Sequence, residues 1–177
     1  MKKPSVTELI GLLDKPALMG WANKIGLEGV SLRDARQKSM SAGVSWHKKI
    51  ENYLVGEIPI QDEEFSKKVE RFFADKTIIA CEKPIAHNDF DGRFDVKYKS
   101  KNGDIYICDF KTNQKRLYRE NKLQLAAYRM AEGCDKVAVI SVPDMVLIES
   151  EIEDFAPYES MIRHLVAIYH LDIQISK

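Results

Sequence analysis

Residues 91–112 of the chain read DGRFDVKYKSKNGDIYICDFKT, and they predict a β-hairpin. A run in which apolar and polar side chains alternate, Gly92–Tyr98, and a mainly apolar run, Asp104–Phe110, flank the segment Lys101–Asn102–Gly103. Such alternation is typical of strands with one buried face, and Asn-Gly is a strong turn signal. We therefore expect one strand over residues 92–98 and the next over residues 104–110.

The length of the loop in this hairpin decides which side chains face each other. A two-residue loop would leave Asp95 and Asp109 on opposite faces of the sheet, because shifting the register by one residue flips every side chain. A three-residue loop, with Gly103 in the left-handed conformation, pairs Ser100 with Asp104 and therefore Asp95 with Asp109. Both loops suit the sequence; only the second builds a site, and we predict it.

Asp109 and Lys111 are two apart on a strand, so their side chains point the same way. Alone they could form a surface ion pair worth about 0–1 kcal/mol. With Asp95 opposite, two carboxylates about 4 Å apart would repel by about 4 kcal/mol at an effective dielectric of about 20. A divalent cation such as Mg²⁺ removes that repulsion, and it can acidify a bound water and polarise a phosphodiester. The three residues therefore predict a hydrolytic phosphodiester site.

The rest of the chain predicts helices before the hairpin and mixed elements after it. Ser5 or Thr7 can cap a first short helix. The other expected helices cover residues 16–26, 31–54 (with a possible break at Gly43), 61–74, 118–131 and 159–171, and the other expected strands cover 77–85, 136–142 and 145–152. This order predicts an α/β layered domain with a mixed sheet.

Length and composition fit one globular domain. The chain has 177 residues, 45% hydrophobic and 31% charged, with a formal net charge of zero. We expect a single domain over 1–177, divided into a helical part (1–76), the sheet with its long helix (77–152) and a closing helix (153–177).

Charge is unevenly placed along the sequence. Residues 32–49 and 111–122 are mainly basic, whereas every charge between 144 and 159 is acidic. This asymmetry predicts one face for a polyanion and another that faces away from it. The plainer interpretation is that these runs are solvated helix faces, and charge alone does not separate the two.

The three cysteines, Cys81, Cys108 and Cys134, are widely spaced and form no Cys-x-x-Cys pair. A zinc ribbon or an iron–sulfur cluster is therefore not expected. Few and unpaired cysteines indicate a reducing compartment, so we expect a cytoplasmic protein. The N-terminal apolar run is broken by polar residues, which predicts neither a signal peptide nor a membrane span.

Two further helical patterns are candidates for the site. His47 lies four residues from both Gly43 and Glu51, so the three share a helix face, and its imidazole could be a metal ligand or a structural side chain. Gln124 and Tyr128 also share one helix face, which on its own is only a polar surface.

Taken together, these motifs resemble the PD-(D/E)xK nuclease superfamily, in particular its RecB-like branch of phage-type and mitochondrial-genome-maintenance-type exonucleases. The similar segments, in chain order, are Ser5–Ile10 with Lys15–Leu18 and Trp21-Ala22, the histidine helix Gly43–Glu51, Gly92-Arg93-Phe94-Asp95, Asp109-Phe110-Lys111-Thr112 and Gln124-Leu125-Ala126-Ala127-Tyr128. Five motifs in this order are specific where each alone is not.

The resemblance implies a restriction-endonuclease-like core of the order αβββαβ with an N-terminal helical extension. It implies that His47, Asp95 and Asp109 bind Mg²⁺ or Mn²⁺, helped by the Phe110 carbonyl, and that Lys111 is the catalytic lysine. It further implies that Gln124 and Tyr128 position DNA or water, and that Glu82 is either a further acid of the site or a solvent-facing strand residue. The residues implied to contact phosphates are Lys115, Arg116, Arg119 and Lys122. Trp46 and Tyr118 would stack on bases, unless they are core residues.

The implied activity is that of a metal-dependent DNA exonuclease, active in phage or bacterial DNA recombination, repair or replication. A structure-specific or nicking endonuclease and a catalytically silent DNA-binding module are the alternatives. The implied partner is DNA, as single strands or duplex ends. The sequence has no helicase motif, so a helicase or recombination protein would have to supply any unwinding; no membrane or iron–sulfur partner is expected.

Overall fold

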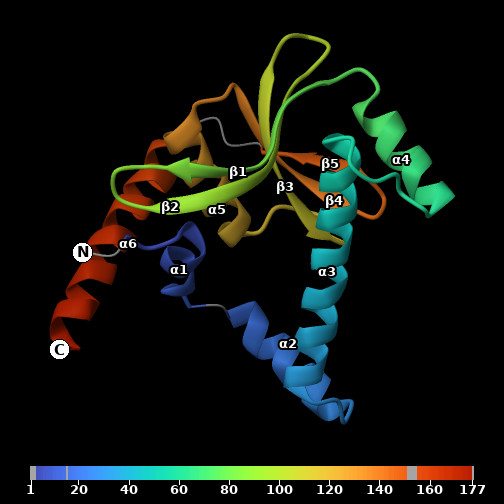
Figure 1. Ribbon diagram of the computed structural model, residues 1–177. Helices are drawn as coiled ribbons and strands as arrows, with labels where there is room; N and C mark the ends of the chain where they lie inside the picture. The colour runs from blue at the N-terminus through green and yellow to red at the C-terminus, as the bar shows by residue number, and fades with distance from the viewer. Residues whose placement is uncertain (1–2, 15, 151–154, 177) are drawn as a thin grey trace.

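The computed structural model describes residues 3–14, 16–150 and 155–176 (Figure 1). In chain order the elements are α1 (Val6–Gly11), α2 (Pro16–Leu27), α3 (Leu32–Leu54), α4 (Glu63–Phe73), β1 (Thr77–Ala86), β2 (Asp91–Lys99), β3 (Ile105–Thr112), α5 (Arg119–Glu132), β4 (Lys136–Val142), β5 (Val146–Glu149) and α6 (Ala156–Ile175).

The five strands form one sheet in the order β1-β2-β3-β4-β5. The pair β3–β4 is parallel and is connected through α5, whereas the other neighbouring pairs are antiparallel. The predicted α/β class with a mixed sheet flanked by helices is therefore confirmed.

Helices cover both faces of the sheet. Neighbouring residues on the central strands point to opposite sides, and apolar side chains are buried on each side. Ile107 and Val139 belong to a buried cluster that includes side chains of α1, α5 and α6. Cys108 and Ile140 belong to a second cluster with side chains of α3 and α4. Figure 1 accordingly shows α6 on one side of the strands and α3 and α4 on the other. Functional side chains can thus reach the sheet from two helical layers.

The helix boundaries follow local capping. At α1, the Ser5 hydroxyl accepts from the Glu8 N–H at 3.1 Å and the Glu8 carboxylate accepts from the Ser5 N–H at 2.7 Å, which is a capping box. Ser31 caps α3, whose helical backbone continues through Gly43 without a break. A helical glycine costs only about 0.5–1 kcal/mol relative to alanine, which the packing of the later turns offsets.

The last two elements differ from the expected bounds. The final strand, expected over 145–152, begins only at Val146, because Met145 has a positive φ of 56° and belongs to the turn. Positions 151 and 152 of the expected strand lie outside the described residues. The closing helix begins at Ala156 instead of residue 159, with a proline in its first turn, where a missing N–H costs nothing.

The β2–β3 hairpin has the predicted three-residue loop. The Ser100 N–H donates to the Asp104 carbonyl at 2.8 Å, and the Gly103 N–H donates to the Ser100 carbonyl at 3.0 Å. Gly103 has a φ of +96°, a conformation that a residue with a Cβ rarely adopts. The predicted register is therefore confirmed up to the last formed pair, Val96 with Cys108.

Beyond that pair the two strands separate. β2 continues along β1 to Asp91, where it also forms an isolated bridge with Ser5, whereas β3 continues along β4 to Thr112. In Figure 1 the β1–β2 ribbon accordingly curves away from β3. The opening between β2 and β3 begins at Asp95, and this is where the candidate site lies.

None of the helices in the described part of the chain combines the length and apolar character that crossing a membrane requires.

Candidate functional site

Three acidic residues lie in a row across three neighbouring strands. The β1–β2 pairs on either side place Glu82 opposite Asp95. The β2–β3 register, continued one position past its last pair, places Asp95 opposite Asp109. The sheet thus brings carboxylates from β1, β2 and β3 to one level, at the point where β2 leaves β3.

Asp95 is the central acid of the row and is nearly buried, with 9% of its surface exposed. Its Oδ2 accepts a hydrogen bond from the Phe110 N–H at 2.5 Å, a backbone donor that the separation of the strands leaves available. Burial, followed by the nearby charge of Asp109, raises the pKa of Asp95 well above its ordinary value. Without a cation, the folded protein therefore resists ionising this group.

His47 approaches Asp95 from α3, on the far side of the opening. Its Nδ1 lies 3.7 Å from Asp95 Oδ2, and its ring packs edge-on against Phe110 with centroids 5.5 Å apart. Burial lowers the pKa of His47, although the charge of Asp109 acts in the other direction. Burial therefore favours the neutral imidazole, which is the form that ligates metal ions.

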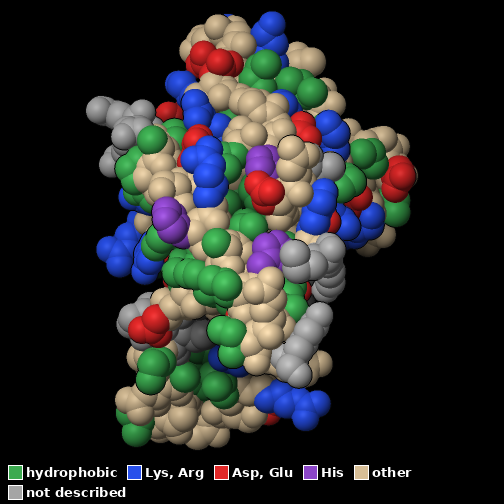
Figure 2. Space-filling view, turned by 90° about the vertical axis from the view of Figure 1, so that its left-hand side faces the viewer, with side chains coloured by type: hydrophobic (Ala, Val, Ile, Leu, Met, Phe, Trp, Pro, Cys, Tyr) green, Lys and Arg blue, Asp and Glu red, His purple; other side chains and the backbone are tan. Residues whose placement is uncertain are grey.

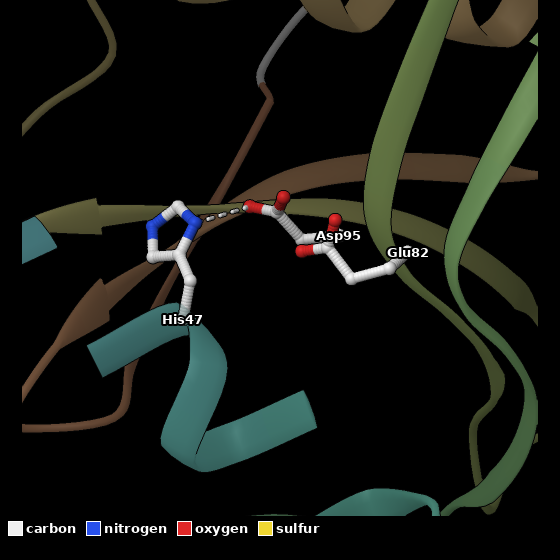
Figure 3. Close-up of side chains that lie close together, drawn as sticks. All are labelled: His47, Glu82 and Asp95. Atoms are coloured by element: carbon white, nitrogen blue, oxygen red, sulfur yellow. Dashed lines mark ion pairs between the residues drawn. The ribbon is translucent and has the colours of Figure 1, made fainter. Parts of the chain in front are cut away.

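Ligand atoms of His47, Glu82 and Asp95 all lie within 4.8 Å of one another, and the three side chains converge in Figure 3. Among the residues that the structure describes, this is the group of His, Cys, Asp and Glu whose spacing could hold a metal ion. One imidazole and two carboxylates form a donor set that suits Mn²⁺, and with water ligands also Mg²⁺.

Asp109 is turned away from that compact group by two neighbours. Its Oδ1 accepts from Gln124 Nε2 at 2.8 Å, and Lys111 Nζ forms an ion pair with Oδ2 at 2.6 Å. The same Oδ2 is buried, and within the described residues no donor is aligned to hydrogen-bond to it. The Lys111 ammonium therefore compensates the charge of Asp109, which lies beside the compact group rather than within it.

The ligand set expected from the sequence, His47, Asp95 and Asp109, is therefore gathered only in part. Glu82 takes the third position in the compact group, and Asp109 lies beside it with its lysine. Sequence reasoning left Glu82 equally open as a solvent-facing residue. Its position depends on a register shift between Ile78 and Ala80 in β1, which alternation of residue types does not reveal.

Glu82 also has an unusual backbone, with a φ of +46° in the middle of a strand. For a residue with a side chain, this left-handed conformation costs about 1–2 kcal/mol. Such strain is found mostly at functional sites, where the surrounding structure enforces it. Here the conformation accompanies a carboxylate aimed at Asp95 and His47 (Figure 3).

Gln124 and Tyr128 lie on α5, one turn apart, as their spacing predicted. Gln124 Nε2 donates to Tyr128 Oη at 2.7 Å as well as to Asp109. Tyr128 is buried, and burial raises the pKa of its hydroxyl, so it stays protonated. The pair therefore anchors Asp109 from the side of the sheet opposite α3.

The basic residues that follow β3 surround a separate hollow. Lys115, Arg116 and Lys122 line a cavity of about 280 Å³, together with Ile148 and Glu149. Arg119 is exposed at the first position of α5. The segment starts directly after Thr112, so these cations lie on the chain that leaves the candidate site.

The two aromatic residues proposed for base stacking differ in their surroundings. Trp46 packs edge-on against Phe65, with ring centroids 4.6 Å apart, at the buried cluster that α3 and α4 form with the sheet. It is therefore a packing residue. Tyr118 is exposed, and the Arg116 guanidinium lies 5.3 Å from its ring centroid, so this ring remains accessible.

Charges of both signs are mixed on the face that carries α6 and the β1–β2 turn. Figure 2 shows basic, acidic and histidine side chains scattered there among hydrophobic ones. This face does not have the single sign that a polyanion surface needs.

Comparisons with known proteins leave the chain without a family. No family model and no curated protein matches it. One solved structure, described as "Crystal structure of SSO0001", is 18% identical, with a TM-score of 0.45, over 94% of this chain and 76% of that one. A likeness at this level bears on neither family nor function.

Proposed function

We propose that the chain is a metal-dependent deoxyribonuclease of the PD-(D/E)xK type, with a restriction-endonuclease-like core, that removes nucleotides from DNA ends. The observation that carries the proposal is the row of Glu82, Asp95 and Asp109 with Lys111 beside it. Carboxylates on three adjacent strands repel one another, and a folded protein keeps such an arrangement for a purpose other than stability.

The donor set supports Mg²⁺ or Mn²⁺ as the cofactor, held by His47, Glu82 and Asp95, with Asp109 on the other side of Asp95. When bound, such an ion supplies an acidified water and a polarised phosphodiester. The protein's own contribution is positioning: the Phe110 N–H fixes Asp95, and Gln124 fixes Asp109.

Lys111 has the position of a group that acts on a phosphate. Its stem rises from the end of β3, its Nζ is 2.6 Å from Asp109, and the side chain is 32% exposed. The ammonium is thus held in place on one side and accessible on the other. It can donate to a phosphate oxygen and offset the charge that builds up there during hydrolysis.

Basic side chains at the surface, three of them exposed and Lys122 half-buried, support DNA as the substrate. Lys115, Arg116, Arg119 and Lys122 follow the site along the chain and would contact phosphates in a salt-sensitive manner that is independent of sequence. The three free cysteines fit a reducing compartment, so we place the activity in the cytoplasm of a bacterium or an infected host, in recombination, repair or replication, beside a helicase or recombination protein.

The test is cleavage of end-labelled linear and circular DNA, single- and double-stranded, with Mg²⁺, with Mn²⁺ and with EDTA. Linear DNA should be degraded only with the metal. Lys111→Ala should lower the rate by at least about 100-fold while DNA binding is retained. Lys101→Ala, in the exposed hairpin turn, is the matched control and should cleave normally.

Two results would replace the proposal. Loss of covalently closed circular single strands would make the protein a structure-specific or nicking endonuclease on the same site. Absence of cleavage of every substrate with either metal would leave only a DNA-binding module.

A further inference from the structure

The N-terminal half of α3 extends beyond the body of the protein. The C-terminal half packs against the sheet through Ile50 and neighbouring side chains of the α3–α4 cluster. In Figure 1 the first turns of α3 run away from the strands, accompanied only by α2. A helix of 23 residues is about 35 Å long, so its N-terminal half, which begins at Leu32, lies well away from the candidate site. We call this half of the helix the α3 arm.

The arm presents two arginines on the helix face that carries His47. Successive residues of an α-helix are turned by about 100°, so Arg36 lies within about 20° of the direction of His47, and Arg33 within about 40°. The acid of the first turns, Asp34, is turned about 140° away. The first two turns of this face therefore carry two basic side chains and no acid.

Both arginines are available to a ligand. Arg33 and Arg36 are exposed, and no hydrogen bond or ion pair to another described residue engages either of them. With a rise of about 1.5 Å per residue, they lie about 21 Å and 16 Å along the axis from His47. Two exposed cations that follow the same helix face as His47 match the successive phosphates of a nucleic-acid strand.

We propose that the α3 arm guides a single DNA strand to the acidic row, with Arg33 and Arg36 each contacting one phosphate. This rests on the proposed function and deepens it, because it names the substrate as one strand that extends beyond the cleavage point. A single line of cations fits one backbone, whereas a duplex presents two. At a spacing of about 3.4 Å per nucleotide, the arginines reach phosphates at most about six nucleotides from the site.

The experiment compares the binding of fluorescent oligo-dT of 4, 8 and 12 nucleotides, by anisotropy in EDTA, to wild type and to Arg33→Gln/Arg36→Gln. The variant should bind the 12-mer roughly tenfold more weakly at low salt. Its slope of log K against log salt should fall by about 1.4, since each phosphate contact on a single strand contributes about 0.7. The 4-mer is too short to occupy the acidic row and reach both arginines at once, so it should show a smaller difference than the 12-mer.

Two controls isolate the arm. Lys99→Gln/Lys101→Gln removes the same charge from the β2–β3 turn, at the end of the molecule away from the arm in Figure 1, and should bind like wild type. Arg33→Lys/Arg36→Lys keeps the charge and should restore most of the affinity. Circular dichroism of each variant reports whether α3 is still folded.

The outcomes separate this inference from the proposed function. A wild type that binds the 12-mer, with an unchanged affinity and salt slope in the arginine variant, would overturn the arm proposal and leave the nuclease proposal standing. An equal loss in the Lys99/Lys101 variant would likewise overturn it, by showing a general charge effect. A wild type that binds none of the oligonucleotides would overturn both.

Discussion

At the scale of single residues, the candidate site is marked by side chains with shifted pKa values and by one residue with an unusual backbone conformation. Asp95 is buried with a raised pKa, His47 is partly buried with a lowered pKa, and Glu82 has a left-handed backbone. The burial of Asp95 and the backbone of Glu82 are unfavourable for the metal-free fold at neutral pH, whereas the lowered pKa of His47 costs stability only below its ordinary value near 6.5. A divalent cation would offset the first of these directly. The sequence indicated Asp95 and His47 through their motifs, but it could not indicate the strain at Glu82, which arises from the register of β1.

Asp95→Asn should stabilise the metal-free protein. The carboxyl has a raised pKa in the folded state, so its penalty is absent below the unfolded value near 3.8, grows as pH rises and is complete above the folded pKa. The variant should therefore unfold at the same temperature as wild type near pH 3.5 and at a higher one near pH 8. A gain of about 1 kcal/mol corresponds to roughly 2–4 °C.

Thermal unfolding in EDTA across pH provides the measurement. The control is Asp62→Asn, at the exposed N-cap of α4, where asparagine keeps the capping acceptor and only the interaction of the charge with the helix N-terminus is lost, so the variant should be no more stable than wild type. A variant at position 95 that is less stable than wild type at pH 8 would contradict the unfavourable burial of this charge.

Glu82→Gly and Glu82→Ala form a matched pair for the backbone strain. Both remove the carboxylate, but only alanine keeps a Cβ at a φ of +46°. We expect the glycine variant to be the more stable by about 1 kcal/mol in urea unfolding. At an ordinary strand position the order reverses, because glycine costs about 0.5–1 kcal/mol there, so an alanine variant that is the more stable would refute the strain.

At the scale of elements, the hairpin β2–β3 determines whether the acids meet. Its turn chemistry, with Gly103 after Lys101-Asn102, was sufficient to predict the register that puts Asp95 opposite Asp109. The separation of β2 from β3 after Val96 was not predictable, because it depends on which neighbouring strand each one continues to follow. That separation opens the site to α3, and it supplies the Phe110 N–H to Asp95.

Gly103→Ala tests the turn on which this register depends. A Cβ there would meet only the end of the Lys99 side chain at 3.9 Å, so the cost is conformational and not steric crowding. We expect a loss of about 1–2 kcal/mol in the free energy of unfolding. The control is Gly20→Ala, in α2, where an added Cβ meets nothing within 4 Å and should stabilise by up to about 1 kcal/mol.

If Gly103→Ala is neutral or stabilising, the loop adopts another conformation, and the result would favour the two-residue loop over the three-residue loop. Chemical denaturation of the two glycine variants side by side distinguishes these outcomes.

At the scale of the whole molecule, two helical layers deliver different parts of the site to one opening in the sheet. His47 comes from α3 on one face, whereas Gln124 and Tyr128 come from α5 on the other. The order of the expected helices and strands predicted an α/β layered domain with a mixed sheet. It could not predict that His47 of the α3 layer would reach Asp95 while Gln124 of the α5 layer holds Asp109.

The account's central claim is that the acidic row holds a divalent cation, and a titration of Mn²⁺ tests it most directly. Electron paramagnetic resonance of free Mn²⁺, followed during addition of protein, measures binding without any nuclease activity. The account predicts that wild type takes up Mn²⁺ with a stoichiometry of at least one per chain, and that Asp95→Asn loses this uptake while Asp62→Asn keeps it. Wild type that leaves Mn²⁺ free, or an Asp95→Asn variant that binds it equally well, would contradict the account.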